Sequence, residues 1–248
     1  MISKIETAFL VALALLHTGT RVRAAEASEF PLWQKAVALA RTNANWVPGL
    51  TINRSEVIYK GESAGMHEIW TRSTLGEKGE VLIETVKVLD DGKDVTKAEK
   101  KKNKTEGKQS GGALGTTPFN PNDQGRLSLK VADRARTIAA RDCLGYFFEL
   151  KNTNTTMTGT AWLDKQTGVP LEIEDIKFNP LPDKHLKRMS MTIRYESTPE
   201  GGWRAKEMVT TGSATMLLMT TDISNTVTYS EHWRKPMRRR ASNKSESR

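Results

Sequence analysis

From residue 50 onward the chain is a succession of short segments rich in Thr, Val, Ile, Tyr and Trp, separated by Gly, Asp and Asn turn signals. Segments of this composition and spacing are typical of β-strands. The connections between them are too short to hold crossover helices, so neighbouring strands are expected to pair antiparallel. We predict strands near residues 51–59, 66–74, 80–89, 126–132, 137–140, 145–151, 157–164, 171–178, 187–197, 203–211, 214–221 and 225–233.

Alternation of apolar and polar residues is clearest in residues 187–197. Because successive side chains of a strand point to opposite faces, this segment has one apolar face and one solvent-exposed polar face. The apolar face is formed by Met189, Met191, Ile193 and Tyr195.

One amphipathic helix is predicted ahead of the strands. Phe30, Trp33, Val37, Ala40 and Ala44 recur at steps of three and four residues, with a Pro-Gly pair at 48–49 beyond the end. This spacing places the apolar side chains on one side of a helix.

The N-terminus matches an export signal. Lys4 precedes an apolar run at residues 8–16, and Val22-Arg23-Ala24 offers a small-residue cleavage site. The run is shorter than the roughly 20 residues that a bilayer requires. We predict a signal peptide at residues 1–24 and a mature domain at 25–237. An uncleaved anchor and a buried core helix are the alternatives.

The net charge of +9 is concentrated in two segments. Residues 234–248 hold seven Lys or Arg against one Glu, and residues 97–108 hold six Lys against two Glu. We predict a disordered basic tail at residues 238–248 and a helical or loop insert at 94–124, a candidate lid. Basicity in such segments, rather than on a folded face, argues against a nucleic-acid partner.

The sequence contains no recognisable motif of a catalytic site. His67, His185 and His232 are isolated from one another, so no metal site and no cofactor are expected. Cys143 lies in an apolar context and is expected to be a small buried hydrophobe. Glu172 and Glu174 alternate with apolar residues and are expected to form the solvated face of a strand rather than a catalytic pair.

The segment 162–174, WLDKQTGVPLEIE, has the pattern of a hairpin. Residues 164–168 close the turn, Pro170 starts a strand, and Trp162, Leu171 and Ile173 can face one surface. The segment resembles a hairpin that recurs in periplasmic outer-membrane lipoprotein-sorting proteins, the LolA-like family, and in RseB-like envelope-stress sensors. The order of helix, strands, insert and closing Met-rich strands is compatible over most of the mature chain.

This resemblance implies a mainly β (α+β) fold. The expected architecture is a curved antiparallel sheet that forms an incomplete β-barrel, with helices capping its concave face around an apolar cavity. The residues expected to line that cavity are Trp70, Trp162, Met189, Met191, Ile193, Tyr195, Met216, Leu218, Tyr229 and Trp233.

The function expected from the resemblance is that of a periplasmic carrier without enzymatic activity, which binds acyl chains of a lipid or lipoprotein for transfer toward the outer membrane. Its partners would be an inner-membrane donor or an outer-membrane acceptor protein, and anionic lipid touching the basic tail. The alternatives are an envelope sensor of the same fold that binds a protein partner, and a hydrolase acting on a lipid-linked substrate.

Overall fold

The computed structural model describes residues 30–43, 45–106, 117–183, 185–216 and 219–236. Its main body is one sheet with the strand order β5-β4-β3-β2-β12-β11-β10-β9-β8-β7-β6, and every pair of neighbours is antiparallel. The strands are β2 (Leu50–Tyr59), β3 (Glu62–Leu75), β4 (Val81–Asp90), β5 (Lys93–Asp94), β6 (Leu127–Ile138), β7 (Arg141–Lys151), β8 (Thr156–Asp164), β9 (Pro170–Asn179), β10 (Leu186–Ser197), β11 (Trp203–Met216) and β12 (Met219–Ser230). A separate two-stranded sheet pairs β1 (Trp46–Val47) with β13 (Trp233–Arg234).

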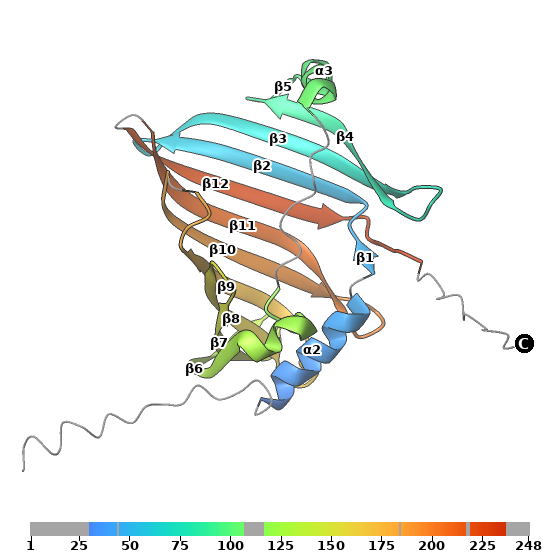
Figure 1. Cartoon of the computed structure of the whole chain (residues 1–248), viewed down its shortest axis with the longest axis vertical. Helices are drawn as coiled ribbons and strands as arrows, with labels where there is room; N and C mark the ends of the chain where they lie inside the picture. Colours follow the sequence, from blue (N-terminus) through green and yellow to red (C-terminus); the bar gives the residue numbers. More distant parts are fainter. Residues whose placement is uncertain (1–29, 44, 107–116, 184, 217–218, 237–248) are drawn as a thin grey trace, which may run out of the picture.

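The sheet is curved and does not close into a barrel, which confirms the expected fold class. From the middle of the sheet, β2 to β5 follow one another in sequence to one edge. From the other edge, β6 to β12 follow one another back to the middle, where β12 pairs with β2. The connection between β5 and β6 therefore joins opposite edges of the sheet (Figure 1). This topology explains why the predicted insert is long.

Helix α2 (Pro31–Asn43) lies across the part of the sheet from β7 and β8 to β11 (Figure 1). Its buried residues are Trp33, which the apolar spacing predicts, and Ala36, whereas Phe30, Val37 and Ala40 of that spacing are partly buried against the core. The Trp33 ring lies 4.7 Å from that of Phe119 and 6.3 Å from that of Phe148, measured between centroids. We call the side of the sheet on which α2 packs the inner face, and the opposite side the outer face.

The other helices lie at the ends of the insert. Helix α3 (Thr96–Glu106) lies beside β4, the second strand from the edge, where Lys100 pairs with Glu84 at 3.1 Å. The short 3₁₀ helix η2 (Pro121–Arg126) lies next to α2, because the Trp33 indole nitrogen donates a hydrogen bond to Gln124 Oε1 at 2.9 Å. The insert is thus anchored at both ends, and its proposed action as a lid stays a prediction.

The hairpin between β8 and β9 has the turn that the sequence indicates. Gly168 donates its backbone N–H to the Asp164 carbonyl at 2.8 Å, and its φ of 75° is one that glycine adopts without strain. The Asp164 carboxylate accepts the backbone N–H of Gln166 at 2.8 Å. Pro170 begins β9, as expected.

Two strand predictions are wrong. The two long strands β11 and β12 lie within residues 203–230, where three short strands reaching residue 233 were predicted, because no turn occurs near Gly212. Gly212 instead allows a close backbone approach: an added Cβ would lie 2.8 Å from the Arg188 carbonyl oxygen, beside a register shift. Residues 126–132 and 137–140 belong to the single strand β6, whose register shifts between Val131 and Ala135.

The predicted signal peptide at 1–24, the basic tail at 238–248, residues 107–116 of the insert and Leu218 lie outside the described residues. Within the part of the chain that is described, no helix has the length and apolar character needed to cross a membrane.

Candidate functional site

Three parallel rows of side chains cross the inner face of β3, β2, β12, β11 and β10. Residues that are directly opposite in a sheet share a face, so the strand register assigns each row. The helix-side row, nearest α2, is Ile69, Asn53, Val227, Met208 and Ile193; the central row is His67, Ser55, Asn225, Thr210 and Met191; the distal row is Gly65, Val57, Ile223, Gly212 and Met189.

Burial decreases across these rows with distance from α2. Val227, Met208 and Ile193 of the helix-side row are buried in the core cluster that includes Trp33. Met191 and Met189 are only partly buried, and Val57 keeps 40% of its surface exposed. Among the described residues, the inner face therefore continues beyond the helix, where Met191, Met189, Val57 and Ile223 are only partly covered or exposed.

Five of the ten predicted cavity residues lie on this inner face. Met189, Met191, Ile193 and Tyr195 do so, as their alternation predicts, and Tyr229 lies two positions from Val227 on β12. Burial raises the pKa of Tyr195 and raises that of Tyr229 to about 12, so both hydroxyls are protonated at neutral pH.

The structure does not place the other five predicted cavity residues on this face. Met216 ends β11, and its side chain is outside the described part, as is all of Leu218. Trp233 belongs to β13, where it pairs with Val47 in the separate small sheet. The expectation that all ten residues line one face is therefore wrong.

Trp162 lies on the outer face, which corrects the expectation that it shares a surface with Leu171 and Ile173. Its partner across the strands is Glu172, which alternates with those two residues. The indole is fully buried all the same, because the guanidinium groups of Arg134 and Arg136 lie over its ring at 5.3 and 5.6 Å. The long arginine side chains shield an apolar ring that would otherwise face water.

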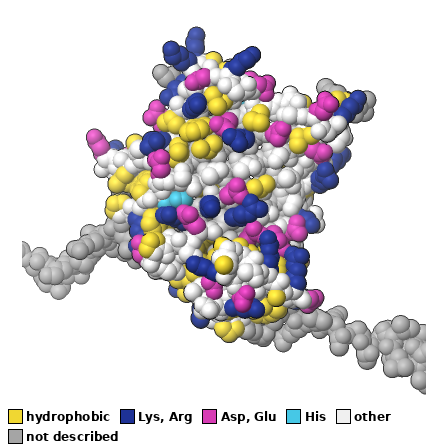
Figure 2. All heavy atoms as spheres, turned by 180° about the vertical axis from the view of Figure 1, so that it is seen from behind, with side chains coloured by type: hydrophobic (Ala, Val, Ile, Leu, Met, Phe, Trp, Pro, Cys, Tyr) yellow, Lys and Arg dark blue, Asp and Glu magenta, His cyan; other side chains and the backbone are white. Residues whose placement is uncertain are grey.

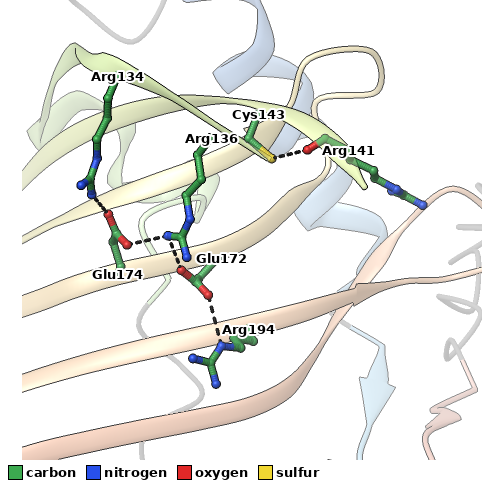
Figure 3. A network of polar contacts seen from close by, with 7 residues as sticks. All are labelled: Arg134, Arg136, Arg141, Cys143, Glu172, Glu174 and Arg194. Carbon is green, nitrogen blue, oxygen red and sulfur yellow. Dashed lines mark hydrogen bonds and ion pairs between the residues drawn. The ribbon is translucent and has the colours of Figure 1, made fainter. Parts of the chain in front are cut away.

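Glu172 and Glu174 are not solvated, contrary to the expectation from alternation. Glu172 is buried and accepts hydrogen bonds from Arg136 at 2.7 Å and from Arg194 at 3.1 Å (Figure 3). Glu174 binds Arg136 at 2.6 Å and also pairs with Arg134. Figure 2 shows basic and acidic side chains interleaved over this outer side of the sheet. The network is an ion-paired cover for Trp162.

Trp70 also lies on the outer face. Its indole nitrogen donates a hydrogen bond to Glu68 Oε1 at 2.6 Å, and the Lys87 amine lies 5.3 Å above its ring. The hydrogen bond from Trp70, together with Arg54, holds the pKa of the Glu68 carboxyl below its ordinary value. These contacts give Trp70 a structural role on the opposite side of the sheet from the methionines.

The sequence analysis did not single out the polar residues of the inner face. Asn53, Ser55 and Asn225 form a cluster there, in which Asn225 Nδ2 donates to Asn53 Oδ1 at 2.6 Å and to Ser55 Oγ at 2.7 Å. Alternation in residues 51–59 places Asn53, Ser55 and Val57 on one face, but only the pairing of β2 with β12 brings Asn225 to them.

The inner face offers contact surface rather than chemically reactive groups. Among the described residues, no group of three or more His, Cys, Asp or Glu side chains is arranged to hold a metal ion. Cys143 is fully buried, and burial raises the pKa of its thiol. An apolar surface with a few neutral polar groups suits reversible binding of an amphiphile.

No protein-family model matches the chain, and no curated protein matches it. Among solved structures, the chain is similar to a DUF1329 family protein from Desulfovibrio piger, at 11% identity over 82% of this chain and 91% of that one, with a TM-score of 0.35. It is similar to MucB in complex with MucA(peri), at 10% identity over 86% and 100% of the two chains, and to the MucA/MucB complex of Pseudomonas aeruginosa, at 11% identity over the same shares, both with a TM-score of 0.25. At these identities and TM-scores, neither a family nor a function follows from the similarities.

Proposed function

We propose that this protein is a carrier without enzymatic activity, which binds the acyl chain of a lipid or lipidated protein on the inner face of its sheet. The observation that carries this proposal is the decrease in burial from Ile193, which is 8% exposed, to Val57, which is 40% exposed, along one continuous face. If the apolar side chains of this face served the core alone, they would end where helix α2 stops covering the sheet. Here apolar side chains continue past α2, with Met191 in the central row and Val57, Ile223 and Met189 in the distal row.

The energetics of such binding are favourable. Transfer of an acyl chain from water contributes about 0.8 kcal/mol for each buried CH₂ group, so half of a long chain supplies several kcal/mol without any covalent step. Met189 and Met191 adapt to irregular ligand shapes, because methionine is unbranched and flexible. We further propose that the carrier works in the periplasm, after export directed by residues 1–24, and exchanges its cargo with membrane-bound donor and acceptor proteins.

A charge on the inner face is expected to abolish this binding. In Met191→Glu a carboxylate replaces a central thioether, and bringing an apolar ligand against it removes its water. We expect the affinity for Nile red, an apolar fluorescent probe, to fall at least about tenfold, which corresponds to about 1.4 kcal/mol. Fluorescence titration of the purified protein measures this change.

The matched control is Thr192→Glu, the neighbouring residue on the outer face of β10. This variant adds the same charge on the opposite face of the sheet. It should leave Nile red binding within about twofold of the wild type, because successive side chains of a strand point to opposite faces and an exposed charge is screened by solvent. If both variants lose the same affinity for Nile red, or if Met191→Glu loses none, the inner face is not the binding site.

A further inference from the structure

A polar stripe runs through the middle of the proposed binding face. The central row consists of His67, Ser55, Asn225, Thr210 and Met191, and four of these five residues are polar. The distal row on one side carries Val57, Ile223 and Met189, and the helix-side row on the other is apolar except for Asn53. Polar groups placed between two apolar rows would meet the polar part of a ligand whose chain lies along the same face.

The hydrogen-bonding capacity of this stripe is only partly used inside the protein. Asn225 Nδ2 donates to both Asn53 Oδ1 and Ser55 Oγ, which fixes the orientation of all three side chains. With that orientation, Asn225 Oδ1 remains as an acceptor, while Asn53 Nδ2 and the Ser55 hydroxyl remain as donors. None of these three groups bonds to another described residue. The cluster therefore presents donors and an acceptor side by side.

The stripe is also electrically neutral at its centre. Of the fifteen described positions in the three rows, His67 is the one with an acid–base side chain, and its Nδ1 lies 3.7 Å from the Asp90 carboxylate. The arginines and glutamates of β9 to β11 pair with one another on the outer face. Asp90 lies opposite His67 on the same face, so a ligand head with a negative charge would lose water here without gaining a counter-charge from these fifteen positions.

We propose that the cluster of Asn53, Ser55 and Asn225 selects ligands with an uncharged head that both accepts and donates hydrogen bonds, such as an amide, over ligands with an anionic head. This inference rests on the proposed function and assigns the head-group class to the same site. The acyl chain lies along the apolar rows, and the carbonyl and N–H of the head bond to the free donors and acceptor of the cluster.

The test uses two probes that share one acyl chain and compete with Nile red: lauroyl glycinamide, which is neutral, and laurate, which is ionised at neutral pH. The wild type should bind lauroyl glycinamide more tightly than laurate. Asn225→Leu removes the amide that orients the cluster and keeps a similar volume. It should lower the ratio of the affinity for lauroyl glycinamide to the affinity for laurate about 2- to 10-fold, the effect of about one hydrogen bond.

Two further variants separate specificity from folding. Thr226→Val, which changes the adjacent residue on the outer face of β12, should behave as the wild type with all three ligands. Ser55→Ala is a milder change in the same cluster and should weaken lauroyl glycinamide in the same direction as Asn225→Leu, with an unchanged unfolding temperature.

The two proposals fail in different ways. If the wild type binds Nile red but prefers laurate, or if Asn225→Leu and Ser55→Ala keep the preference for the amide, the head-group inference is overturned and the carrier proposal stands. If the wild type binds neither Nile red nor either acyl probe, both are overturned.

Discussion

Replacing Trp33 with alanine is expected to lower the free energy of unfolding by about 3–5 kcal/mol, the usual effect of truncating a large buried aromatic residue. Trp33 is fully buried and is the main residue through which α2 contacts the sheet. Its ring lies against Phe119, Tyr146 and Phe148, and its indole nitrogen bonds to Gln124. The substitution therefore leaves a cavity at the meeting point of helix, insert and sheet.

Urea unfolding followed by circular dichroism measures the loss, and Lys35→Ala provides the comparison on the same helix. Lys35 is exposed, so its truncation should change stability by no more than about 0.5 kcal/mol. A loss below about 1 kcal/mol for Trp33→Ala would contradict the packing of α2 on the inner face.

Replacing Glu172 with glutamine is expected to destabilise the protein by about 2 kcal/mol. Removing one partner of a buried ion pair costs about 3–5 kcal/mol when the other charge stays buried. The cost is smaller here, because the side chains of Arg136 and Arg194 keep 37% and 52% of their surface exposed and can be hydrated. Part of the lost stability comes from Trp162. Arg136 both bonds to Glu172 and covers the Trp162 ring, so the substitution leaves that ring less well shielded from water.

The comparison for this change is Glu207→Gln in the same network. Glu207 is more exposed and has Arg194 as its partner, so its loss should cost less than about 1 kcal/mol. Thermal unfolding of both variants, with the intrinsic tryptophan fluorescence recorded, measures the difference. Equal and small effects for the two would mean that Glu172 is hydrated like a surface residue.

Local sequence signals predicted the hairpins and the apolar face of β10. The turn at residues 164–168, the helix around Trp33 and the set Met189 to Tyr195 all follow from spacing alone. The break predicted near Gly212 failed because a glycine in a strand either ends the strand or permits close backbone contact, and only the neighbouring strand decides between the two.

The site was harder to predict than the fold. Trp162 and Trp70 are large and apolar, and composition alone assigns such residues to a core face. In the structure Arg134 and Arg136 cover Trp162, whereas Glu68 bonds to Trp70, and both tryptophans lie on the outer face. Such coverage depends on which strands are neighbours. The polar cluster was missed for the same reason, since Asn53 and Asn225 are far apart in sequence and meet only through the pairing of β2 with β12.

The most direct test of a lipid-binding inner face is native mass spectrometry, combined with lipid extraction, on protein purified without detergent from a periplasmic fraction. The carrier proposal predicts a population heavier than the polypeptide, acylated species in the extract, and loss of both in Met191→Glu but not in Thr192→Glu. A polypeptide mass alone, with no uptake of added fatty acid or lipopeptide, would contradict the proposal and favour an envelope sensor that binds a protein partner.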